Sequence, residues 1–371
     1  MRALNHEYEI NVLNGIVKID PKTFEIKLVP HDKENIFLWK LNVSYNPEAK
    51  CPVIDKFFED TLAEPKDRYA LEEALGTTLQ PHLITKKAVI SYGEPDTGKS
   101  TTTNLIHAFL GENNCSNLTL QQITEKDFLL SNLFGKIANI AGDLSQEAVK
   151  NIEQFKSLTG GDPQEGDRKY KETVKFCNQA KLFFNMNKLP RIYNADLATW
   201  NRMMPFKYVR VFIDEAAYQK LPEEDQANYG IKDINIIRKL TTEEELSGLL
   251  NKAIAGLIRF LKNWKFSYAR GVEDVSKEWI RLSDSFMAFC MDTIEQGDAS
   301  EDYITRKALA SEYNKYIKKH GIKGVGDKSM KATLSGEYGV YVDGFTTVPG
   351  SNERCWEGIK WKNKKTTGVL I

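Results

Sequence analysis

The stretch Gly93-Glu94-Pro95-Asp96-Thr97-Gly98-Lys99-Ser100 decides the architecture of this chain. Two glycines separated by four residues, followed by lysine and a hydroxyl residue, form the pattern of a phosphate-binding loop. An apolar run at 88–92 precedes the stretch, and a helix-forming run at 100–110 follows it and ends at Gly111. This order predicts a tight loop between a buried strand and a helix, with backbone N–H groups facing phosphate oxygens.

The residues expected to contact a nucleotide are consecutive. They are Gly93, Glu94, Pro95, Asp96, Thr97, Gly98, Lys99, Ser100 and Thr101. In such a loop the Lys99 ammonium reaches the β- and γ-phosphates, and the Ser100 hydroxyl holds Mg²⁺. The sequence therefore predicts ATP and Mg²⁺ as cofactors.

The composition excludes several classes of protein. Among 371 residues, 51 Lys and Arg balance 51 Asp and Glu, so any nucleic-acid contact must come from a local basic patch. No apolar run is long enough for a membrane span, and residues 1–6 lack the apolar core of a signal peptide. The five cysteines are far apart, without metal-ligand spacing, which indicates a reducing setting. We expect a protein of the host cell cytoplasm with no membrane partner.

Hydrophobic patterning divides the chain into three expected domains. Residues 1–85 contain an Asn14-Gly15 hairpin signal and then a helical period over 51–79. Residues 86–270 alternate apolar runs with helical or polar stretches, which predicts an α/β core with a parallel sheet. The expected strands are the apolar runs 88–92, 137–141, 182–186 and 208–212. An amphipathic helix at 241–264 belongs to this domain.

The third expected domain, 271–371, follows a charge-mixed boundary at 265–280. Three helix-like segments are followed by a tail rich in glycine and aromatic residues, a pattern that predicts a winged helix. The three segments are 279–296, 305–320 and 327–335.

Three polar residues downstream of the loop are candidates for ATP chemistry, which requires an acid, a polar sensor and a cation. Asp143 ends the apolar run at 137–141, and Asn187 ends the next run. Arg202 precedes a further apolar stretch. Each has a structural alternative, because Asp143 also suits a helix cap, Asn187 a turn before Pro190, and Arg202 a surface ion pair.

The segment between these residues carries a resemblance to a known family. It contains Gly160-Gly161-Asp162 and then Arg168-Lys169-Tyr170-Lys171. In this position it resembles the motif particular to superfamily 3 helicases, which are AAA+ motors of viral and plasmid replication. The chain is most similar to the helicase half of phage, archaeal-plasmid and poxvirus-type primase-helicases.

The resemblance implies a role for each candidate. Asp143 is then the Walker B acid and joins Ser100 at Mg²⁺, Asn187 is the sensor, and Arg202 is an arginine finger that acts on a neighbouring subunit's ATP. Many AAA+ motors carry two adjacent acids, but Gly142 precedes Asp143 here. The general base therefore stays open between Glu94 and a polar residue such as Ser145.

The resemblance also implies a hairpin at about 163–175 that lines a central pore. Arg168, Lys169 and Lys171 are then the DNA-binding residues, since cations track the phosphates of a single strand. The alternative is a solvated, charged hairpin tip. The tail from 301 to 371 holds 13 Lys and Arg against 8 Asp and Glu, which suits duplex DNA.

Two functions follow as expectations. The first is an ATP-dependent replicative helicase or translocase of a virus or plasmid, acting as a hexameric ring on single-stranded DNA. The second is an ATP-switched initiator or loader that recruits a primase or polymerase without processive unwinding.

Overall fold

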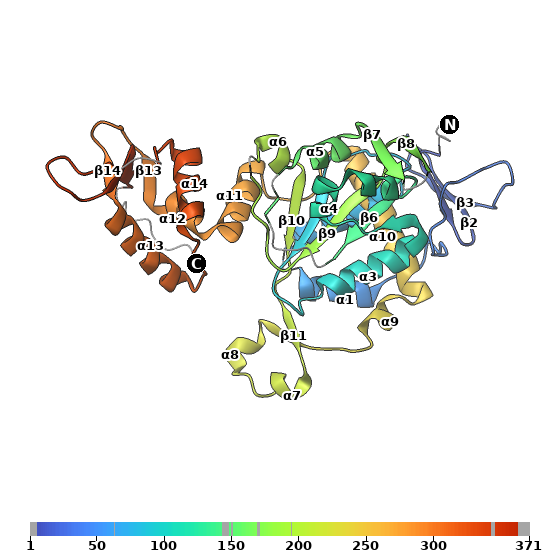
Figure 1. Ribbon diagram of the computed structural model, residues 1–371. Coiled ribbons are helices and arrows are strands. Elements are labelled where there is room, and N and C mark those ends of the chain that lie inside the picture. Colours follow the sequence, from blue (N-terminus) through green and yellow to red (C-terminus); the bar gives the residue numbers. More distant parts are fainter. Residues whose placement is uncertain are drawn as a thin grey trace. The chain divides into compact units, whose positions relative to one another are not determined.

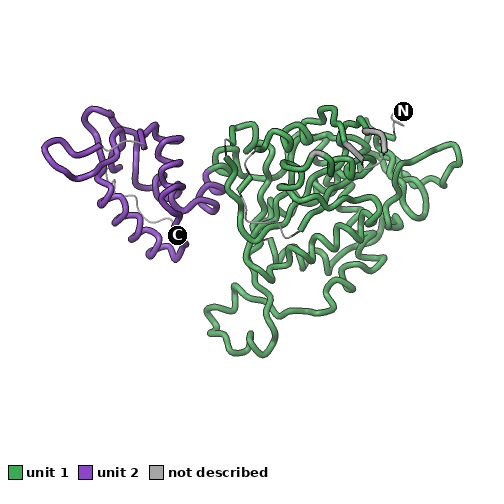
Figure 2. The backbone as a smooth tube through the Cα atoms, in the orientation of Figure 1, with its two compact units in different colours: residues 1–276 green, residues 277–371 purple. Residues whose placement is uncertain are grey.

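The computed structural model describes residues 6–62, 64–142, 148–149, 151–168, 171–193, 195–342 and 346–362. The chain forms two compact units, residues 1–276 and 277–371 (Figure 2). None of the described helices combines the length and apolar character that a membrane span requires.

The first unit begins with an antiparallel sheet of β1 (Glu9–Val12), β2 (Gly15–Ile19) and β3 (Ile26–Val29). Asn14-Gly15 stands at the turn between β1 and β2, which confirms the expected hairpin. The helical pattern expected over 51–79 is confirmed, with an interruption that the sequence did not predict. Two helices occupy it, α1 (Pro52–Thr61) and α2 (Pro65–Thr78), because a proline favours the first turn of a new helix over the interior of an old one.

A five-stranded parallel sheet forms the core of this unit (Figure 1). Its strand order is β10-β4-β9-β6-β5. The strands are β4 (Ala88–Tyr92), β5 (Cys115–Ser116), β6 (Ala138–Ala141), β9 (Lys181–Met186) and β10 (Met203–Lys207). Every residue of β4, β6 and β9 is buried, as a parallel sheet covered on both faces requires. The expected α/β core with a parallel sheet is confirmed.

The fourth expected strand, 208–212, is wrong. The edge strand is β10, where Pro205 lacks an N–H but an edge position leaves that donor unneeded. Tyr208 is buried beyond the end of β10. Residues 211–213 instead form β11 (Val211–Ile213), which pairs only with β12 (Tyr229–Ile231) in a separate two-stranded sheet.

Helices and 3-10 turns connect these strands. They are α3 (Lys99–Leu110), η1 (Glu112–Asn114), α4 (Leu120–Glu125), η2 (Asp127–Leu133), α5 (Glu153–Gly160), α6 (Leu197–Trp200), α7 (Glu215–Tyr218), α8 (Glu223–Gln226), α9 (Ile236–Leu240) and α10 (Glu243–Asn263). The long helix α10 matches the amphipathic helix expected at 241–264, and the Thr242 hydroxyl caps it by accepting from the Glu245 N–H. Its buried face packs along α2, which joins the N-terminal helices to the rest of the unit.

An antiparallel hairpin stands between α5 and β9, where the family resemblance implies one. It consists of β7 (Pro163–Arg168) and β8 (Lys171–Cys177). The middle of β7 is packed closely against η2, because a Cβ on Gly166 would lie 2.8 Å from the Cα of Ser131.

Helix α11 (Val272–Ser283) crosses into the second unit, which continues with α12 (Ser285–Thr293), β13 (Ile294–Gln296), β14 (Tyr303–Thr305), α13 (Arg306–His320), α14 (Asp327–Tyr338), β15 (Cys355–Glu357) and β16 (Ile359–Trp361). The helix expected at 279–296 is interrupted at Asp284, whose carboxylate accepts from the N–H groups of Phe286 and Met287 and starts α12. Strands β13 and β14 precede α13 and pair antiparallel with β16 and β15. The sequence predicts that the strands of this unit follow all three helices, but β13 and β14 stand before α13.

Candidate nucleotide-binding site

The loop 93–100 has the backbone that its glycines predict. Gly93 has φ of 150° and Gly98 has φ of 93°, in the region that favours glycine. A Cβ on Gly93 would lie 2.3 Å from the carbonyl oxygen of Tyr208, and one on Gly98 would lie 2.8 Å from Cγ2 of Thr61. Both positions therefore exclude a side chain for steric as well as conformational reasons.

The Lys99 side chain folds back over this loop and is buried. Its Nζ donates to the carbonyl oxygens of Gly93 at 2.8 Å and Glu94 at 2.5 Å, and to Oγ1 of Thr97 at 3.1 Å. The Thr97 hydroxyl in turn donates to the Glu94 carbonyl at 2.8 Å. The ammonium thus lies at the centre of the loop, with three of the loop's own oxygens as its hydrogen-bond partners.

The N-terminus of α3 offers donors to an anion. No side chain among the described residues caps this helix, whose N-cap is Gly98. The first N–H groups of a helix have no partner within it, and the helix dipole adds positive potential there. An uncapped N-terminus beside a lysine is therefore suited to phosphate.

Asn185 of β9 fixes the first turn of α3. Its amide donates to the Lys99 carbonyl oxygen at 2.9 Å and forms a second hydrogen bond with the Thr103 hydroxyl. Because β9 lies beside β4 in the sheet, these bonds attach the helix to the strand next to the one that carries the loop. No motif in the sequence marks Asn185, although it stands two residues before Asn187.

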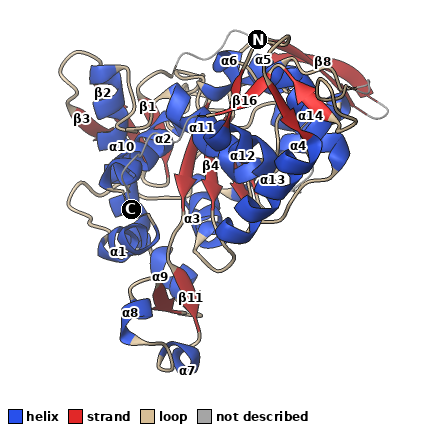
Figure 3. Cartoon of the chain, turned by 90° about the vertical axis from the view of Figure 1, so that its left-hand side faces the viewer, coloured by secondary structure: helices blue, strands red, loops and turns tan. Residues whose placement is uncertain are grey.

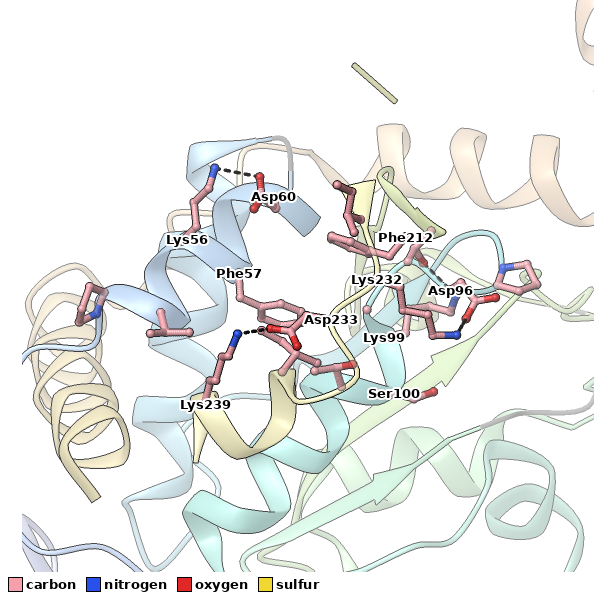
Figure 4. A pocket seen from close by; sticks show the side chains of 18 of the residues that line it. Lys56, Phe57, Asp60, Asp96, Lys99, Ser100, Phe212, Lys232, Asp233 and Lys239 are labelled. Atoms are coloured by element: carbon pink, nitrogen blue, oxygen red, sulfur yellow. Dashed lines mark hydrogen bonds and ion pairs between the residues drawn. The ribbon is translucent and has the colours of Figure 1, made fainter. Parts of the chain in front are cut away.

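A cavity of about 750 Å³ opens beside the loop (Figure 4). The loop residues 95–101 and Asn187 line one part of it. The remaining lining residues come from α1, β11, β12, α9 and the segment between β12 and α9. They are Pro52, Val53, Lys56, Phe57, Asp60, Phe212, Ile231, Lys232, Asp233, Ile236 and Lys239. Apolar side chains beside a loop of backbone donors suit a ligand with a flat apolar part and an anionic part.

One ion pair and one backbone hydrogen bond connect the cavity wall to the loop. Nζ of Lys232 lies 3.2 Å from the Asp96 carboxylate, and the Phe212 N–H donates to the Asp96 carbonyl oxygen at 2.9 Å. Lys239 pairs with Asp233 at 2.6 Å and holds the pKa of that carboxyl below its usual value. The strands β11 and β12 are thus attached to the loop through Asp96.

Predicted residues that directly follow a strand of the parallel sheet are the ones expected to lie near the loop. The carboxyl ends of parallel strands lie at one edge of the sheet, and ligands bind there in α/β proteins. Asn187 follows β9 and lines the cavity with its side chain exposed. Asp143 follows β6, but it lies outside the described residues, as do Ser145 and Lys169.

The loop lies at the edge of the sheet formed by the carboxyl ends of the strands. Arg202 lies at the opposite edge, formed by their amino ends. Its carbonyl oxygen accepts from the N–H of Ala88, the first residue of β4, at 2.7 Å. Five strand residues separate that end of β4 from the loop, a distance of about 17 Å. The guanidinium donates to the Thr159 hydroxyl at 3.0 Å and the Ala198 carbonyl at 2.8 Å. Within one chain, Arg202 does not reach the cavity.

The predicted DNA-binding residues Arg168 and Lys171 lie at the tip-proximal ends of β7 and β8, where only the backbone is described. The cavity residues of α1 and of 231–239 were missed from the sequence. No local motif marks them, since they lie roughly 40 to 140 residues from the loop along the chain and share only a location in the fold.

Two family models match parts of the chain. One, described as D5 N terminal like, matches residues 4–63, and the other, a family of unknown function designated DUF5906, matches residues 91–202. The second match contains the loop 93–100, Asn187 and Arg202.

A curated protein and several solved structures are also similar. "Putative helicase 184R" of Invertebrate iridescent virus 6 is 26% identical over 168 residues, which are 41% of this chain and 17% of that protein. The chain NrS-1 C terminal region (305-718), in its apo structure, shares 12% identity and a TM-score of 0.48, over 93% of this chain and 82% of that one. An A form apo structure of the same region gives 14% identity and a TM-score of 0.45, over 88% and 82%.

Proposed function

We propose that this protein is an ATP-driven DNA helicase or translocase of viral or plasmid replication, with a superfamily 3 AAA+ core that acts as a ring. The observation that carries the proposal is the cavity at the uncapped N-terminus of α3, with Lys99 inside the loop and Asn187 at its rim. Its volume of about 750 Å³ is in the range of small-molecule sites. The similarity to a viral protein named as a helicase supports the same reading.

In this proposal ATP places its base against the apolar wall and its phosphates against the loop. Phe57 and Ile236 then face the base, while Lys99 exchanges its carbonyl partners for the β- and γ-phosphates. Ser100 and Asp143 are the residues that would hold Mg²⁺, and the bound ion would supply positive charge beside the γ-phosphate.

The distance of Arg202 from the loop supports a ring. An arginine finger must touch the γ-phosphate, and Arg202 lies at the other edge of its own sheet. A head-to-tail arrangement would bring the Arg202 edge of one subunit to the loop edge of the next, and such contacts close into rings when the rotation allows it. We propose six subunits, with the β7–β8 hairpin of each facing a central strand of DNA.

The anchoring of that hairpin fits a lever driven by ATP. Near its base, Phe176 of β8 meets Phe134 edge-on with ring centroids 5.9 Å apart, and further along β7 Gly166 lies against Ser131. A hairpin held along its length and charged near its tip can contact phosphates without unfolding. We propose that the second unit is a winged helix that binds duplex DNA.

The test compares the intact protein with the Lys99→Ala variant in ATPase and strand-displacement assays. We expect DNA-stimulated hydrolysis and displacement by the intact protein, and loss of both in the variant by at least about a hundredfold. ATP-dependent DNA binding with negligible displacement would instead support the loader that recruits a primase or polymerase. Absence of any ATP hydrolysis would overturn the proposal.

A further inference from the structure

A second cavity, of about 350 Å³, lies in the first unit away from the loop. We name it the Trp264 pocket. Its wall includes the aromatic side chains of Phe260, Trp264, Phe266 and Tyr268. Lys87 and Lys265 also line it, as does Arg270, whose guanidinium is paired with the Asp67 carboxylate at 2.5 Å. No acidic side chain is among its described lining residues. An aromatic pocket with a cationic lining fits a segment that is both acidic and apolar.

Trp264 itself is under conformational strain. It follows the last residue of α10 with φ of 49°, in the left-handed region where helices usually end with glycine. A bulky aromatic residue there is an outlier, and its side chain is 68% exposed. Backbone strain of this kind is concentrated at functional sites, and exposed tryptophan is a common anchor of protein interfaces.

The chain also carries a segment of the complementary kind. We name residues 214–228, between β11 and β12, the acidic arm. It contains the carboxylates Asp214, Glu215, Glu223, Glu224 and Asp225 and a single cation, Lys220. All residues from 211 to 229 are described, and none of them is buried. The arm projects beyond the sheet in two views (Figures 1 and 3).

The arm lacks a core of its own. Its helices α7 and α8 have four residues each and pack on β12. Tyr218 and Leu221 are only partly covered. Ordering such a segment costs conformational entropy that burial within the chain does little to offset. A partner surface would supply the missing burial.

The pocket and the arm lie at opposite edges of the central sheet. The arm follows β11, whose Phe212 is hydrogen-bonded to Asp96 in the loop. The pocket includes Lys87, just before β4, and Asn201, next to Arg202. The arm therefore accompanies the loop half of the proposed ATP site, and the pocket accompanies the Arg202 half.

We propose that the acidic arm of one subunit docks in the Trp264 pocket of the next copy of this chain. Tyr218 and Leu221 pack against the aromatic wall, and the carboxylates of α8 meet Lys87 and Lys265. The contact is head-to-tail and places Arg202 of one subunit at the loop of its neighbour. The inference rests on the proposed function, which requires Arg202 to act across an interface.

The first experiment replaces Trp264 by glycine in the full chain and follows assembly by sedimentation with a non-hydrolysable ATP analogue. Glycine accepts the left-handed backbone, so we expect an unchanged or higher melting temperature. Loss of the anchor should raise the concentration for half-assembly by at least about tenfold. A Trp264→Gly protein that assembles like the parent overturns the inference, as does a parent that stays monomeric at every concentration.

A second experiment tests charge. The triple variant Glu223→Lys, Glu224→Lys and Asp225→Lys should assemble as poorly as Trp264→Gly. The triple control Glu34→Lys, Glu48→Lys and Glu301→Lys changes three exposed carboxylates elsewhere by the same net charge and should assemble normally. Adding Lys265→Glu to the arm variant should restore part of the assembly. Equal effects of arm and control variants overturn the inference.

Two readouts separate this inference from the proposed function. Binding of a fluorescent ATP analogue at low protein concentration should be unchanged in the arm and Trp264 variants, because they leave the loop intact. Arm variants that assemble and hydrolyse ATP normally overturn the docking but leave the motor in place. A Trp264→Gly variant that assembles but loses single-stranded oligonucleotide assigns the pocket to nucleic acid and also overturns the docking.

Discussion

At the scale of single residues, two asparagines at the end of β9 differ in role. Asn185 holds the fold, and Asn187 is proposed to act on the nucleotide. Asn185 is buried and bonded to the first turn of α3, whereas Asn187 is exposed in the cavity. We expect Asn185→Ala to lower the free energy of unfolding by about 1–3 kcal/mol, because it leaves buried groups unpaired. Asn187→Ala should leave stability unchanged.

The two variants should also differ in which step of ATP hydrolysis they impair. Asn187→Ala should lower kcat for ATP with little change in nucleotide affinity, whereas Asn185→Ala should weaken nucleotide binding because α3 loses its attachment. Thermal unfolding and single-turnover hydrolysis measure the two effects. Equal stability losses in both variants would contradict this division.

Lys181 is a buried cation on the same strand. Burial lowers its pKa to about 7, and its Nζ donates to the Gln80 carbonyl at 2.6 Å. The folded chain then binds fewer protons than the unfolded chain between pH 7 and the usual lysine value of 10.5. Stability from this group therefore rises with pH across that window, and its full cost is present below pH 7.

Lys181→Met should consequently stabilise the protein most at low pH. We expect a gain of about 1–3 kcal/mol at pH 6, from removing a poorly compensated buried charge, and a smaller gain or a loss at pH 10. Denaturant unfolding at the two pH values measures the difference. A gain that does not vary with pH would argue against the burial effect.

At the scale of elements, glycines allow α2 and α10 to approach closely. A Cβ on Gly256 would lie 2.6 Å from the Glu72 carbonyl oxygen, and one on Gly76 would lie 2.5 Å from the Ala253 carbonyl oxygen. The close approach places Arg259 of α10 2.5 Å from the Glu73 carboxylate, which is fully buried. The interface therefore combines backbone contact with a buried ion pair.

Gly256→Ala should destabilise the protein although alanine is the better helix former. Helix propensity favours the substitution by about 1 kcal/mol. Overpacking against backbone, which cannot rotate away, opposes it by about 1–3 kcal/mol, and we expect the second effect to exceed the first. Ala255→Ser at the neighbouring exposed position is the control, and denaturant unfolding is the measurement. A more stable Gly256→Ala protein would show that the helices separate easily.

At the scale of the whole molecule, the loop and Arg202 lie at opposite edges of one sheet, so the proposed site needs two subunits. Lys99→Ala and Arg202→Ala should each abolish hydrolysis when assembled alone. Mixed in equal amounts, they should regain about a quarter of the parent rate, because random assembly joins an intact loop to an intact Arg202 at roughly one interface in four. Steady-state ATPase of the mixture measures this, and failure to regain activity would contradict a role for Arg202 across the interface.

Local patterns were sufficient for much of the fold. The loop 93–100, strand 88–92, the 9–19 hairpin and helix α10 each depend on residues close together in sequence, so spacing and periodicity predict them. The helix and strand boundaries predicted wrongly lie near Pro65, Pro205 and Asp284. Each depends on a proline or a helix cap, and the surrounding structure decides whether that residue ends an element.

The sequence by itself determined the loop, its lysine and the parallel α/β core, since the spacing of glycines and apolar runs is a local property. Tertiary structure alone decided that α1 and residues 231–239 complete the cavity, that Asn185 holds α3, and that Arg202 lies at the far edge. Strand order and helix crossing bring distant residues together through packing, and no spacing along the chain records which segments will meet.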